Sequence, residues 1–525
     1  MPHEARAPGN GVELLELRVL DGPNRFFTRP AIKLEFGGTE PGTAAEVAAT
    51  AALAVRRLHV ALGMPAPRIT SRRSVDDLRA LVAYPWRRRT ISQAIGSAAA
   101  RLALHRSDEV RELRALQANA LGPLPGLPRP HFPIVTVTGT NGKSTTTRLI
   151  AHVASSIGLQ VGMTNSDGIE LRGELVEAGD WTGFGGAARV LAEPRLDLAV
   201  LETARGGVLL RGIGYAANDV SVVTNVSADH LGLQGIDTLD ELAEVKATVV
   251  RITKRSGWAV LNGEDPLVWA MRRETRAHWY VFSLDPGVSA IDAALEADGR
   301  ACVLDRGWIV IRRGDGPSVR VVRANELPIT LGGLSRHNVA NALAATAACD
   351  ALGFAVPDIG AGLRAFAPDS AANPGRLNLF ARDGVHALVD FAHNEAGLRG
   401  LLEVARGVAR GRVLLAVGTA GDRGDEIIRS LGEIAATGAD DLVIAEKPHY
   451  LRGRELGEMN ELIRAGVRAG GFRGEVGSLA SEVEALAELV SRAQPGDVVA
   501  VMTHAERGDV FDWLAREGFE PARPG

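Results

Sequence analysis

A phosphate-binding loop is predicted between residues 133 and 148, where the sequence reads PIVTVTGTNGKSTTTR. The β-branched run at 134–137 predicts a buried strand, and Lys-Ser directly after a Gly/Asn turn predicts the start of a helix. Backbone N–H groups at a helix N-terminus face an anion, a lysine adds a point charge, and a serine hydroxyl can bind Mg²⁺. Lys143 and Ser144 are therefore predicted to bind a nucleoside triphosphate with its metal.

The loop departs from the general phosphate-loop pattern at one position. That pattern has a glycine five residues before the glycine of its Gly-Lys pair, where this sequence has Val137. The loop is thus a shortened variant, and the alternative is an ordinary Gly/Asn turn between a strand and a helix. The placement of Lys-Ser directly after the turn favours the phosphate loop.

Two further polar groups follow predicted strands. Glu202 ends the apolar run LAVLE, and His230 follows a second apolar run in the stretch SADHLG. Because the carboxyl ends of parallel strands gather at one edge of a sheet, both side chains are expected beside the phosphate loop. A carboxylate there usually holds Mg²⁺ against the β- and γ-phosphates. Alone, Glu202 could be a capping or ion-paired acid and His230 a core histidine, but with Ser144 a metal site is favoured.

Composition limits the class of protein. A length of 525 residues predicts about three domains, and 46% hydrophobic with 23% charged residues is typical of a soluble globular protein. A formal net charge of −4 argues against nucleic acid as a partner. The two cysteines lack a CxxC spacing, the N-terminus lacks the order of a signal peptide, and no apolar run reaches the length of a membrane span. A cytoplasmic protein without a membrane partner is expected.

The fold class predicted is α/β, in three domains. Residues 1–130 are predicted to form a small α+β domain ending in a Pro-rich linker. Residues 131–373 alternate strands and helices, as in a P-loop domain built on a parallel sheet, and residues 374–525 predict a Rossmann-like C-terminal α/β domain. Because the last part lacks a GxGxxG fingerprint, a nicotinamide site is not expected.

Smaller elements are also predicted. In the N-terminal domain, residues 43–62 predict an amphipathic helix, and further helical stretches are expected near 75–82 and 91–119. Between 301 and 328, short alternating runs predict a small antiparallel sheet. The N-terminal domain carries no recognisable catalytic constellation, so a scaffold or an interface for homo-oligomers is the expected role.

The motifs, taken in order, resemble those of the Mur ligase family. The resemblance runs from about residue 132 to 465 and is most similar, within the family, to the cyanophycin synthetases, whose N-terminal start is resembled less specifically. Val137 fits the family's own form of the loop. The matching strings are VTGTNGKST, SDGIELRG, GDWTG, LETARGG, TNVSADHLG, VK, LNGEDP, HNVANALAA, NPGR, DFAHNEAG, GTAGDRGDE and LRGRELGE.

The resemblance implies an ATP-dependent ligase with ATP and two Mg²⁺ ions as cofactors. A substrate carboxylate becomes an acyl phosphate, and an amine then displaces phosphate to leave an amide. By motif position, the implied cofactor-binding residues are Gly139, Thr140, Asn141, Gly142, Lys143, Ser144, Thr145, Asn338, Arg376 and Asp390. The implied metal ligands are Ser144, Glu202 and His230, and the implied catalytic residues are Lys143, His230 and Lys246, the last matching a lysine that many Mur enzymes carry as a carbamate.

The expected partners are a small-molecule or peptide carboxylate and an amino acid. Residues 1–130 run directly into the phosphate loop and leave no room for the ATP-grasp domain of cyanophycin synthetases, so one kind of amide bond is expected. Two alternatives stay open. One is a glutamate ligase like folylpolyglutamate synthase, and the other is a non-catalytic nucleotide-binding scaffold.

Overall fold

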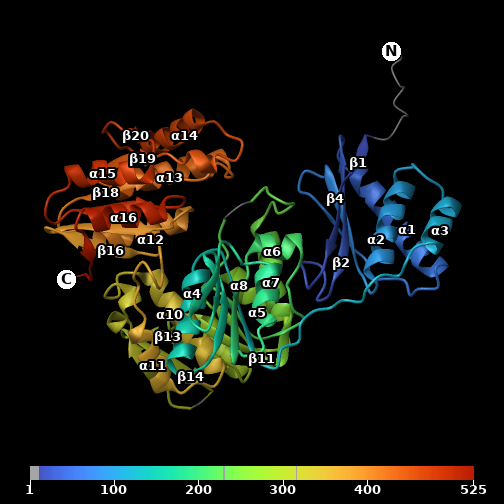
Figure 1. The fold of residues 1–525 in the computed structure, drawn as a ribbon, viewed down its shortest axis with the longest axis horizontal. Helices are drawn as coiled ribbons and strands as arrows, with labels where there is room; N and C mark the ends of the chain where they lie inside the picture. The colour runs from blue at the N-terminus through green and yellow to red at the C-terminus, as the bar shows by residue number, and fades with distance from the viewer. Residues whose placement is uncertain (1–10, 229–230, 315, 525) are drawn as a thin grey trace.

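The computed structural model describes residues 11–228, 231–314 and 316–524. These residues form three units, each built on its own β-sheet, and the central unit lies between the other two (Figure 1). The units are named here the N-terminal, central and C-terminal units. Within the described residues, no helix combines the length and apolarity needed to cross a bilayer.

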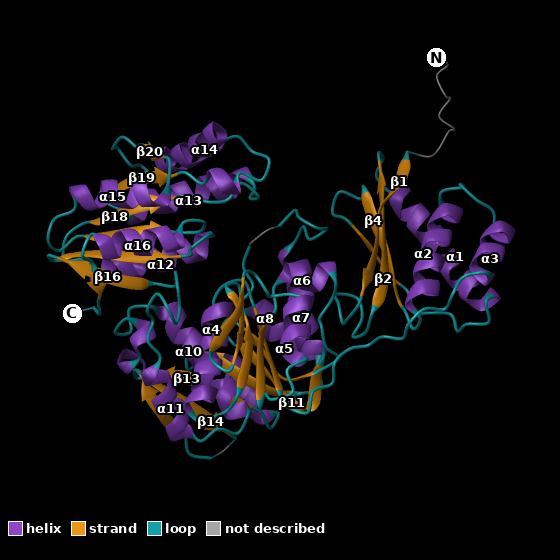
Figure 2. Cartoon of the chain, viewed as in Figure 1, coloured by secondary structure: helices purple, strands orange, loops and turns teal. Residues whose placement is uncertain are grey.

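The N-terminal unit is a four-stranded antiparallel sheet with its helices on the face away from the central unit (Figure 2). The strand order is β1-β2-β4-β3. Its elements are β1 (Val12–Leu20), β2 (Ala31–Gly38), α1 (Thr43–Ala61), β3 (Thr70–Arg73), β4 (Arg79–Pro85), α2 (Arg89–Ala103) and α3 (Glu109–Gln117).

Two expectations about the N-terminal unit are wrong. The helix expected near 75–82 is a turn followed by strand β4, which pairs with β2 and β3 and is buried along most of its length. A short apolar run fits either a helix or a central strand, and pairing with two neighbours decides the matter here. The single stretch 91–119 is two helices, because the Asp108 side chain accepts from the Arg111 backbone N–H and caps a new helix.

The central unit contains an eleven-stranded sheet with β5 near its middle. The order is β15-β14-β13-β12-β11-β10-β5-β9-β6-β7-β8. Its strands are β5 (Ile134–Thr138), β6 (Val161–Thr164), β7 (Gly168–Leu171), β8 (Glu174–Ala178), β9 (Leu198–Glu202), β10 (Asn218–Val223), β11 (Thr253–Asn262), β12 (His278–Ser283), β13 (Arg300–Asp305), β14 (Trp308–Arg313) and β15 (Val319–Arg323).

A small separate sheet was expected between residues 301 and 328, and this expectation is wrong. The strands there extend the central sheet, because β13 pairs in parallel with β12 before β14 and β15 add on in antiparallel order. The parallel core of the sheet therefore runs from β13 to β6 and has antiparallel strands at both edges.

Helices cover both faces of the central sheet. The buried side chains of α4, α10 and α11 pack on one face, and those of α5, α6, α7 and α8 pack on the other. The helices of the central unit are α4 (Lys143–Ser156), α5 (Phe184–Leu191), α6 (Arg205–Leu210), α7 (Leu239–Arg251), α8 (Pro266–Ala270), α9 (Ser289–Glu296), α10 (Arg336–Ala351) and α11 (Val356–Ala365). Its 3₁₀ turns are η1 (Met271–Glu274), η2 (Ala324–Glu326) and η3 (Pro328–Thr330).

The C-terminal unit is a doubly wound sheet with the order β20-β19-β18-β21-β17-β16-β22. Helices α12–α14 cover one face and α15 and α16 the other. Its elements are β16 (Asn378–Arg382), β17 (Val385–Asp390), α12 (Glu395–Val408), β18 (Val413–Val417), α13 (Asp425–Gly438), β19 (Asp441–Ala445), η4 (Pro448–Tyr450), α14 (Leu456–Ala469), β20 (Ser478–Leu479), α15 (Glu482–Arg492), β21 (Val498–Met502), α16 (Arg507–Arg516) and β22 (Glu520–Pro521).

The close packing of α13 on α14 gives a stability prediction. A Cβ atom on Gly466 would lie 1.9 Å from the Arg429 carbonyl oxygen, whereas one on Gly457 in the same helix would meet nothing within 4 Å. Gly466→Ala should therefore destabilise the protein by about 1–3 kcal/mol, because the two helices must move apart. Gly457→Ala should leave stability unchanged or raise it by less than about 1 kcal/mol. Calorimetry of the full chain measures both, and equal melting temperatures for the two variants would contradict this packing.

Candidate active site

Three neighbouring parallel strands deliver polar groups to one edge of the central sheet. Strand β5 lies between β9 and β10 and pairs in parallel with both. Gly139 follows β5, Glu202 ends β9, and Asn225 follows β10. The convergence expected from sequence for Glu202 and the phosphate loop is therefore present in the fold.

The phosphate loop is fixed by backbone geometry that requires glycine. Gly142 caps α4 with a φ of 84°, and a Cβ atom there would lie 2.2 Å from Asn341 Oδ1. The Thr140 N–H donates to the Asn225 carbonyl oxygen at 2.9 Å, and the Asn141 N–H donates to Asn225 Oδ1 at 2.9 Å. Asn225 thus holds the loop from the neighbouring strand, in addition to the helix that follows it.

Two lysines approach the loop from different sides. Lys143 Nζ donates to the Thr140 carbonyl oxygen at 2.8 Å, which places its charge inside the loop. Lys246, on α7, is buried, and its Nζ donates to the Gly139 carbonyl oxygen at 2.6 Å. Lys246 therefore contacts the loop directly, although it follows it by about a hundred residues in sequence.

The electrostatics at Glu202 favour a bound cation. Burial raises the pKa of the Glu202 carboxyl, although the charge of Lys143 and a hydrogen bond from Ser144 oppose this. Its Oε2 atom is buried without a hydrogen-bond partner among the described residues. A divalent cation would satisfy that oxygen and stabilise the ionised form. Ser144 and Glu202 supply the hard oxygen ligands that Mg²⁺ prefers, so these residues fit the metal.

The metal would need other ligands as well. Within the described ranges, no group of three His, Cys, Asp or Glu side chains is placed to hold a metal ion. Mg²⁺ usually keeps several waters and phosphate oxygens and takes only one or two protein ligands, so two oxygen donors suffice. His230, the predicted ligand of a second ion, lies outside the described residues.

A cavity of about 420 Å³ opens between the phosphate loop and the C-terminal unit. Its volume falls in the range of small-molecule sites. Both the central and the C-terminal unit contribute to its walls. The lining includes Thr140, Asn141, Gly142, Lys143, Ser144, Thr145, Asn338, Arg376 and Asp390 among the predicted residues, and Asn225, Phe282, His337, Asn341, Phe391 and His393 in addition.

The C-terminal unit presents a paired charge to this cavity. The Arg376 guanidinium lies over the Phe391 ring, 4.4 Å from its centroid, and donates to Ser166 Oγ at 3.4 Å. Asp390 accepts from the Leu377 backbone N–H at 2.9 Å. Burial raises the pKa of Asp390 to about 6, while the charge of Arg376 acts in the opposite direction. Arg376 and Asp390 thus bring a cation and an acid from the C-terminal unit to the cavity that the phosphate loop also lines.

Two hydrogen bonds of its side-chain amide hold Asn338 in place. Its Nδ2 donates to the Ile329 carbonyl oxygen at 2.9 Å, and its Oδ1 accepts from Asn341 Nδ2 at 3.0 Å. Asn341 Oδ1 in turn accepts from Thr146 of α4 at 3.3 Å. The side chains of α10 therefore connect Ile329 to the helix that carries the phosphate loop.

Most predicted site residues meet at this cavity. Gly139, Glu202 and Lys246 do not line the cavity. Lys246 bonds to the Gly139 carbonyl oxygen, and Glu202 interacts with Lys143 and Ser144 of the loop. Ser166, Asn341 and Asn394 were not predicted as site residues, although each lies in a motif that carries the family resemblance. Ser166 Oγ lies 3.1 Å from Ser144 Oγ, and the amide groups of Asn141 and Asn394 bond to each other across the two units.

Comparison with known proteins identifies the family. The Mur ligase middle domain matches residues 137–349, and the Mur ligase glutamate ligase domain matches residues 375–504. The chain is 31% identical over 402 residues to UDP-N-acetylmuramyl-tripeptide synthetase of Deinococcus radiodurans, which covers 74% of this chain and 76% of that protein. The chain belongs to the Mur ligase family. The expected class of enzyme, an ATP-dependent carboxylate–amine ligase, is thereby confirmed.

Higher identity is found with part of a longer protein. The chain is 40% identical over 369 residues to cyanophycin synthetase of Crocosphaera subtropica, and 43% identical over 336 residues to that of Synechocystis. These matches cover 70% and 64% of this chain but only 42% and 38% of the relatives. The chain thus spans about two fifths of the length of these relatives.

Solved structures confirm the predicted α/β fold. E. coli FolC in complex with DHPP and ADP matches with a TM-score of 0.54 at 20% identity, and covers 74% of this chain and 90% of that one. A pseudomurein peptide ligase type C from Methanothermus fervidus matches with a TM-score of 0.52 at 20% identity, and covers 74% and 79%. ATP use and Mg²⁺ dependence follow from membership of the family.

The ionisation of Asp390 should make stability depend on pH. With a pKa of about 6, the folded protein binds this proton more tightly than the unfolded chain, where an aspartate has a pKa of about 4. The stability that this proton adds is complete below about pH 4 and is lost as the pH rises through about 6. The wild type should therefore lose stability relative to Asp390→Asn between these values.

Melting temperatures of both proteins from pH 4 to pH 8 give this difference. Asp383→Asn is the matched control, because Asp383 lies in the β16–β17 turn with 93% of its side chain exposed. Its difference from wild type should stay flat. A flat profile for Asp390→Asn would show that the pKa is not raised.

Proposed function

We propose that this protein couples a carboxylic acid to an amino acid through an acyl phosphate, with ATP as the energy source. The observation that carries the proposal is the cavity bounded by Lys143 and Ser144 on the central unit and by Arg376 and Asp390 on the C-terminal unit. A nucleotide in this cavity would have its phosphates at the loop and its sugar and base towards Asp390 and Asn338. Its γ-phosphate would then meet an incoming carboxylate at the sheet edge.

The proposed reaction has two steps. A carboxylate oxygen attacks the γ-phosphorus, the bond from that phosphorus to the bridging oxygen breaks, and ADP leaves. The amine nitrogen then attacks the acyl carbon, the bond from carbon to the phosphate oxygen breaks, and inorganic phosphate leaves with the electron pair while the nitrogen releases a proton. The products are an amide, ADP and phosphate.

The main obstacle to the first step is the meeting of two anions. Lys143 at the loop and Arg376 opposite it both place positive charge where the phosphate would lie, so they lower the repulsion felt by an approaching carboxylate. When bound, Mg²⁺ would neutralise further phosphate charge, and Ser144 and Glu202 are the residues that would hold it. We propose His230 as the ligand of a second ion and Lys246 as a further catalytic residue.

The walls of the cavity come from two units, an arrangement that can keep water away from an unstable intermediate. Asn141 of the loop and Asn394 of the C-terminal unit form reciprocal amide hydrogen bonds of 3.3 and 3.0 Å. With the units in contact, the reacting groups are shielded from water, which would hydrolyse an acyl phosphate.

We further propose the domain division 1–130, 131–373 and 374–525, with the acid and amine supplied as small molecules or peptides. The family resemblance to cyanophycin synthetases implies an aspartyl peptide and arginine as the first pair to test. A homo-oligomer formed through the N-terminal domain and a cytoplasmic location remain predictions. In the N-terminal unit, α1 exposes Leu53 and Val60 seven residues apart on one side, which is compatible with such a contact.

A phosphate-release screen tests the reaction. Amino acids, including arginine and glutamate, are combined with carboxylic acceptors, and product masses are measured. The proposal expects phosphate release only when an acid and an amine are both present, with a product one water lighter than their sum. Glutamate as the accepted amine, with a folate acceptor, would favour the folylpolyglutamate-type alternative. Tight ATP binding without turnover for any pair would favour the scaffold.

Replacing the loop lysine should abolish turnover. Lys143→Ala removes the charge that faces the phosphates, so kcat should fall by at least about a hundredfold, which is typical when a positioned charge is lost. Lys254→Ala is the matched control, because Lys254 is half exposed and pairs with Asp219 at the opposite end of the sheet. Steady-state phosphate release measures both variants. Activity in Lys143→Ala similar to that of Lys254→Ala would exclude the assigned site.

A further inference from the structure

One aspartate joins the central and C-terminal units. Asp167 lies in the turn between β6 and β7, and its Oδ1 accepts from the guanidinium of Arg507 at 2.6 Å. Arg507 begins α16 of the C-terminal unit, 340 residues further along the chain. The other carboxylate oxygen accepts from Arg148 at 2.6 Å. Arg148 is buried in α4, the helix that follows the phosphate loop.

The residue before Asp167 contacts the predicted phosphate site. Ser166 Oγ lies 3.1 Å from Ser144 Oγ and accepts from Arg376 at 3.4 Å. The turn is also held by Asn165, whose Oδ1 accepts from the backbone N–H groups of Asp167 and Gly168. The position of Asp167 and the positions of Ser144 and Arg376 are therefore linked through one short, rigid turn.

The charges around Asp167 make this contact a strong one. Burial alone would raise the pKa of its carboxyl, but the positive charges of Arg148, Arg507 and Arg376 lower it below the ordinary value. Asp167 is therefore ionised throughout the neutral range. Three arginines converge on one carboxylate, so the units cannot separate at Arg507 without leaving charge less well compensated.

The segment that joins the two units, residues 374–376 and here called the hinge, has little room beside this contact. Arg507 also donates to the Pro374 carbonyl oxygen at 3.4 Å, and a Cβ atom on Gly375 would lie 2.6 Å from Arg507 Cδ. Gly375 has a φ of 65°, which favours glycine. Arg376 follows directly, so the side chain of Arg507 rests on the segment that carries Arg376 to the cavity.

We infer that Asp167 and Arg507 are positioning residues, which hold the C-terminal unit against the central unit so that Arg376 and Ser144 share the phosphate site. This inference rests on the proposed function for its effect on turnover, but not for its effect on the arrangement of the units. Neither residue lines the cavity, so each acts through Ser166, Arg148 and the hinge.

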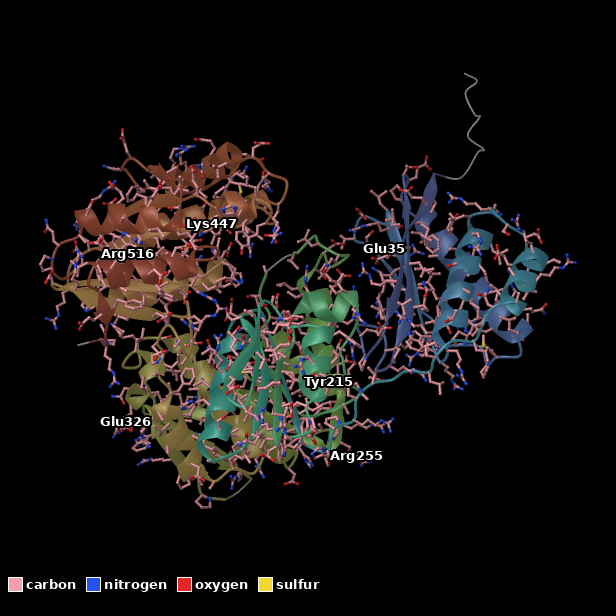
Figure 3. The ribbon with its side chains drawn as sticks, in the orientation of Figure 1. Glu35, Tyr215, Arg255, Glu326, Lys447 and Arg516 are labelled. Carbon is pink, nitrogen blue, oxygen red and sulfur yellow. The ribbon has the colours of Figure 1, made fainter. Side chains whose placement is uncertain are left out.

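Two variants of Arg507 and one control are the first test of the inference. Arg507→Met removes the charge and keeps the length of the side chain, and Arg507→Lys keeps a charge that can pair with Asp167 but cannot donate through two nitrogens. Arg516→Met is the control, because Arg516 lies at the other end of α16 and, in the part of the chain that the structure describes, bonds only to the Asp512 carbonyl oxygen of the same helix, at 3.3 Å (Figure 3). All three should melt within a few degrees of the wild type, as calorimetry will establish.

Turnover should separate positioning from binding. For Arg507→Met, kcat should fall about tenfold while the KM for ATP changes less than about threefold, because the phosphate loop stays intact. Arg507→Lys should recover part of the loss, and Arg516→Met should match the wild type. Asp167→Asn should reduce kcat at least as much, because it removes the pair with Arg148 as well. Adding it to Arg507→Met should lower kcat by less than the product of the two single effects, because both changes remove the same Asp167–Arg507 ion pair.

Small-angle X-ray scattering gives a readout that needs no turnover. The radius of gyration of Arg507→Met should exceed that of Arg516→Met, both without nucleotide and with Mg²⁺ and a non-hydrolysable ATP analogue. If no substrate pair gives turnover, the proposed function fails, and scattering alone still decides this inference. Equal radii for the two variants in both conditions, or equal kcat values, would overturn it.

Discussion

The backbone of the phosphate loop is held from several sides at once, and the arrangement of the site depends on this. The Gly139 carbonyl oxygen accepts from Lys246, the Asn141 carbonyl oxygen accepts from Thr224 Oγ1 at 2.6 Å, and Asn225 receives two loop N–H groups. These contacts come from α7 and the end of β10. A loop whose carbonyl groups are already bonded has its remaining N–H groups fixed in direction, which is what a bound phosphate requires.

Close approach explains why this loop carries glycines. A Cβ atom on Gly139 would lie 1.8 Å from Thr224 Oγ1, and its φ of 151° is one that other residues rarely adopt. The neighbouring strand is therefore pressed against the loop at this point. Val137, which replaces the glycine of the general pattern, is instead a fully buried strand residue that packs in the main core with α4 and α10. The shortened loop thus gains one more core position.

The sequence indicates the elements at the centre of the candidate site, but not the contacts that join its units. Strand β5, the loop and the strand that ends at Glu202 could be predicted because each combines a local pattern with an ordered motif. The expected helix at 75–82 is wrong because the apolar run that begins at Ala80 is too short to show a period, and only pairing with β2 and β3 determines the strand. The contact of Asp167 with Arg507 has no local signal at all, because the two residues are 340 positions apart and lie in different units.

The N-terminal unit also contacts α7, the helix whose Lys246 bonds to the phosphate loop. Arg25 pairs with Glu241 at 2.9 Å and with Glu244 at 2.7 Å, and both acids lie on the first turns of the helix that carries Lys246. The helix is fixed at its start by a capping box between Thr238 and Glu241. Because Arg25 is itself buried, these pairs are less screened by solvent than surface ion pairs. The placement of Lys246 against Gly139 therefore depends on contacts that begin in the N-terminal unit. That unit is part of the framework of the site, even though none of its described residues lines the cavity.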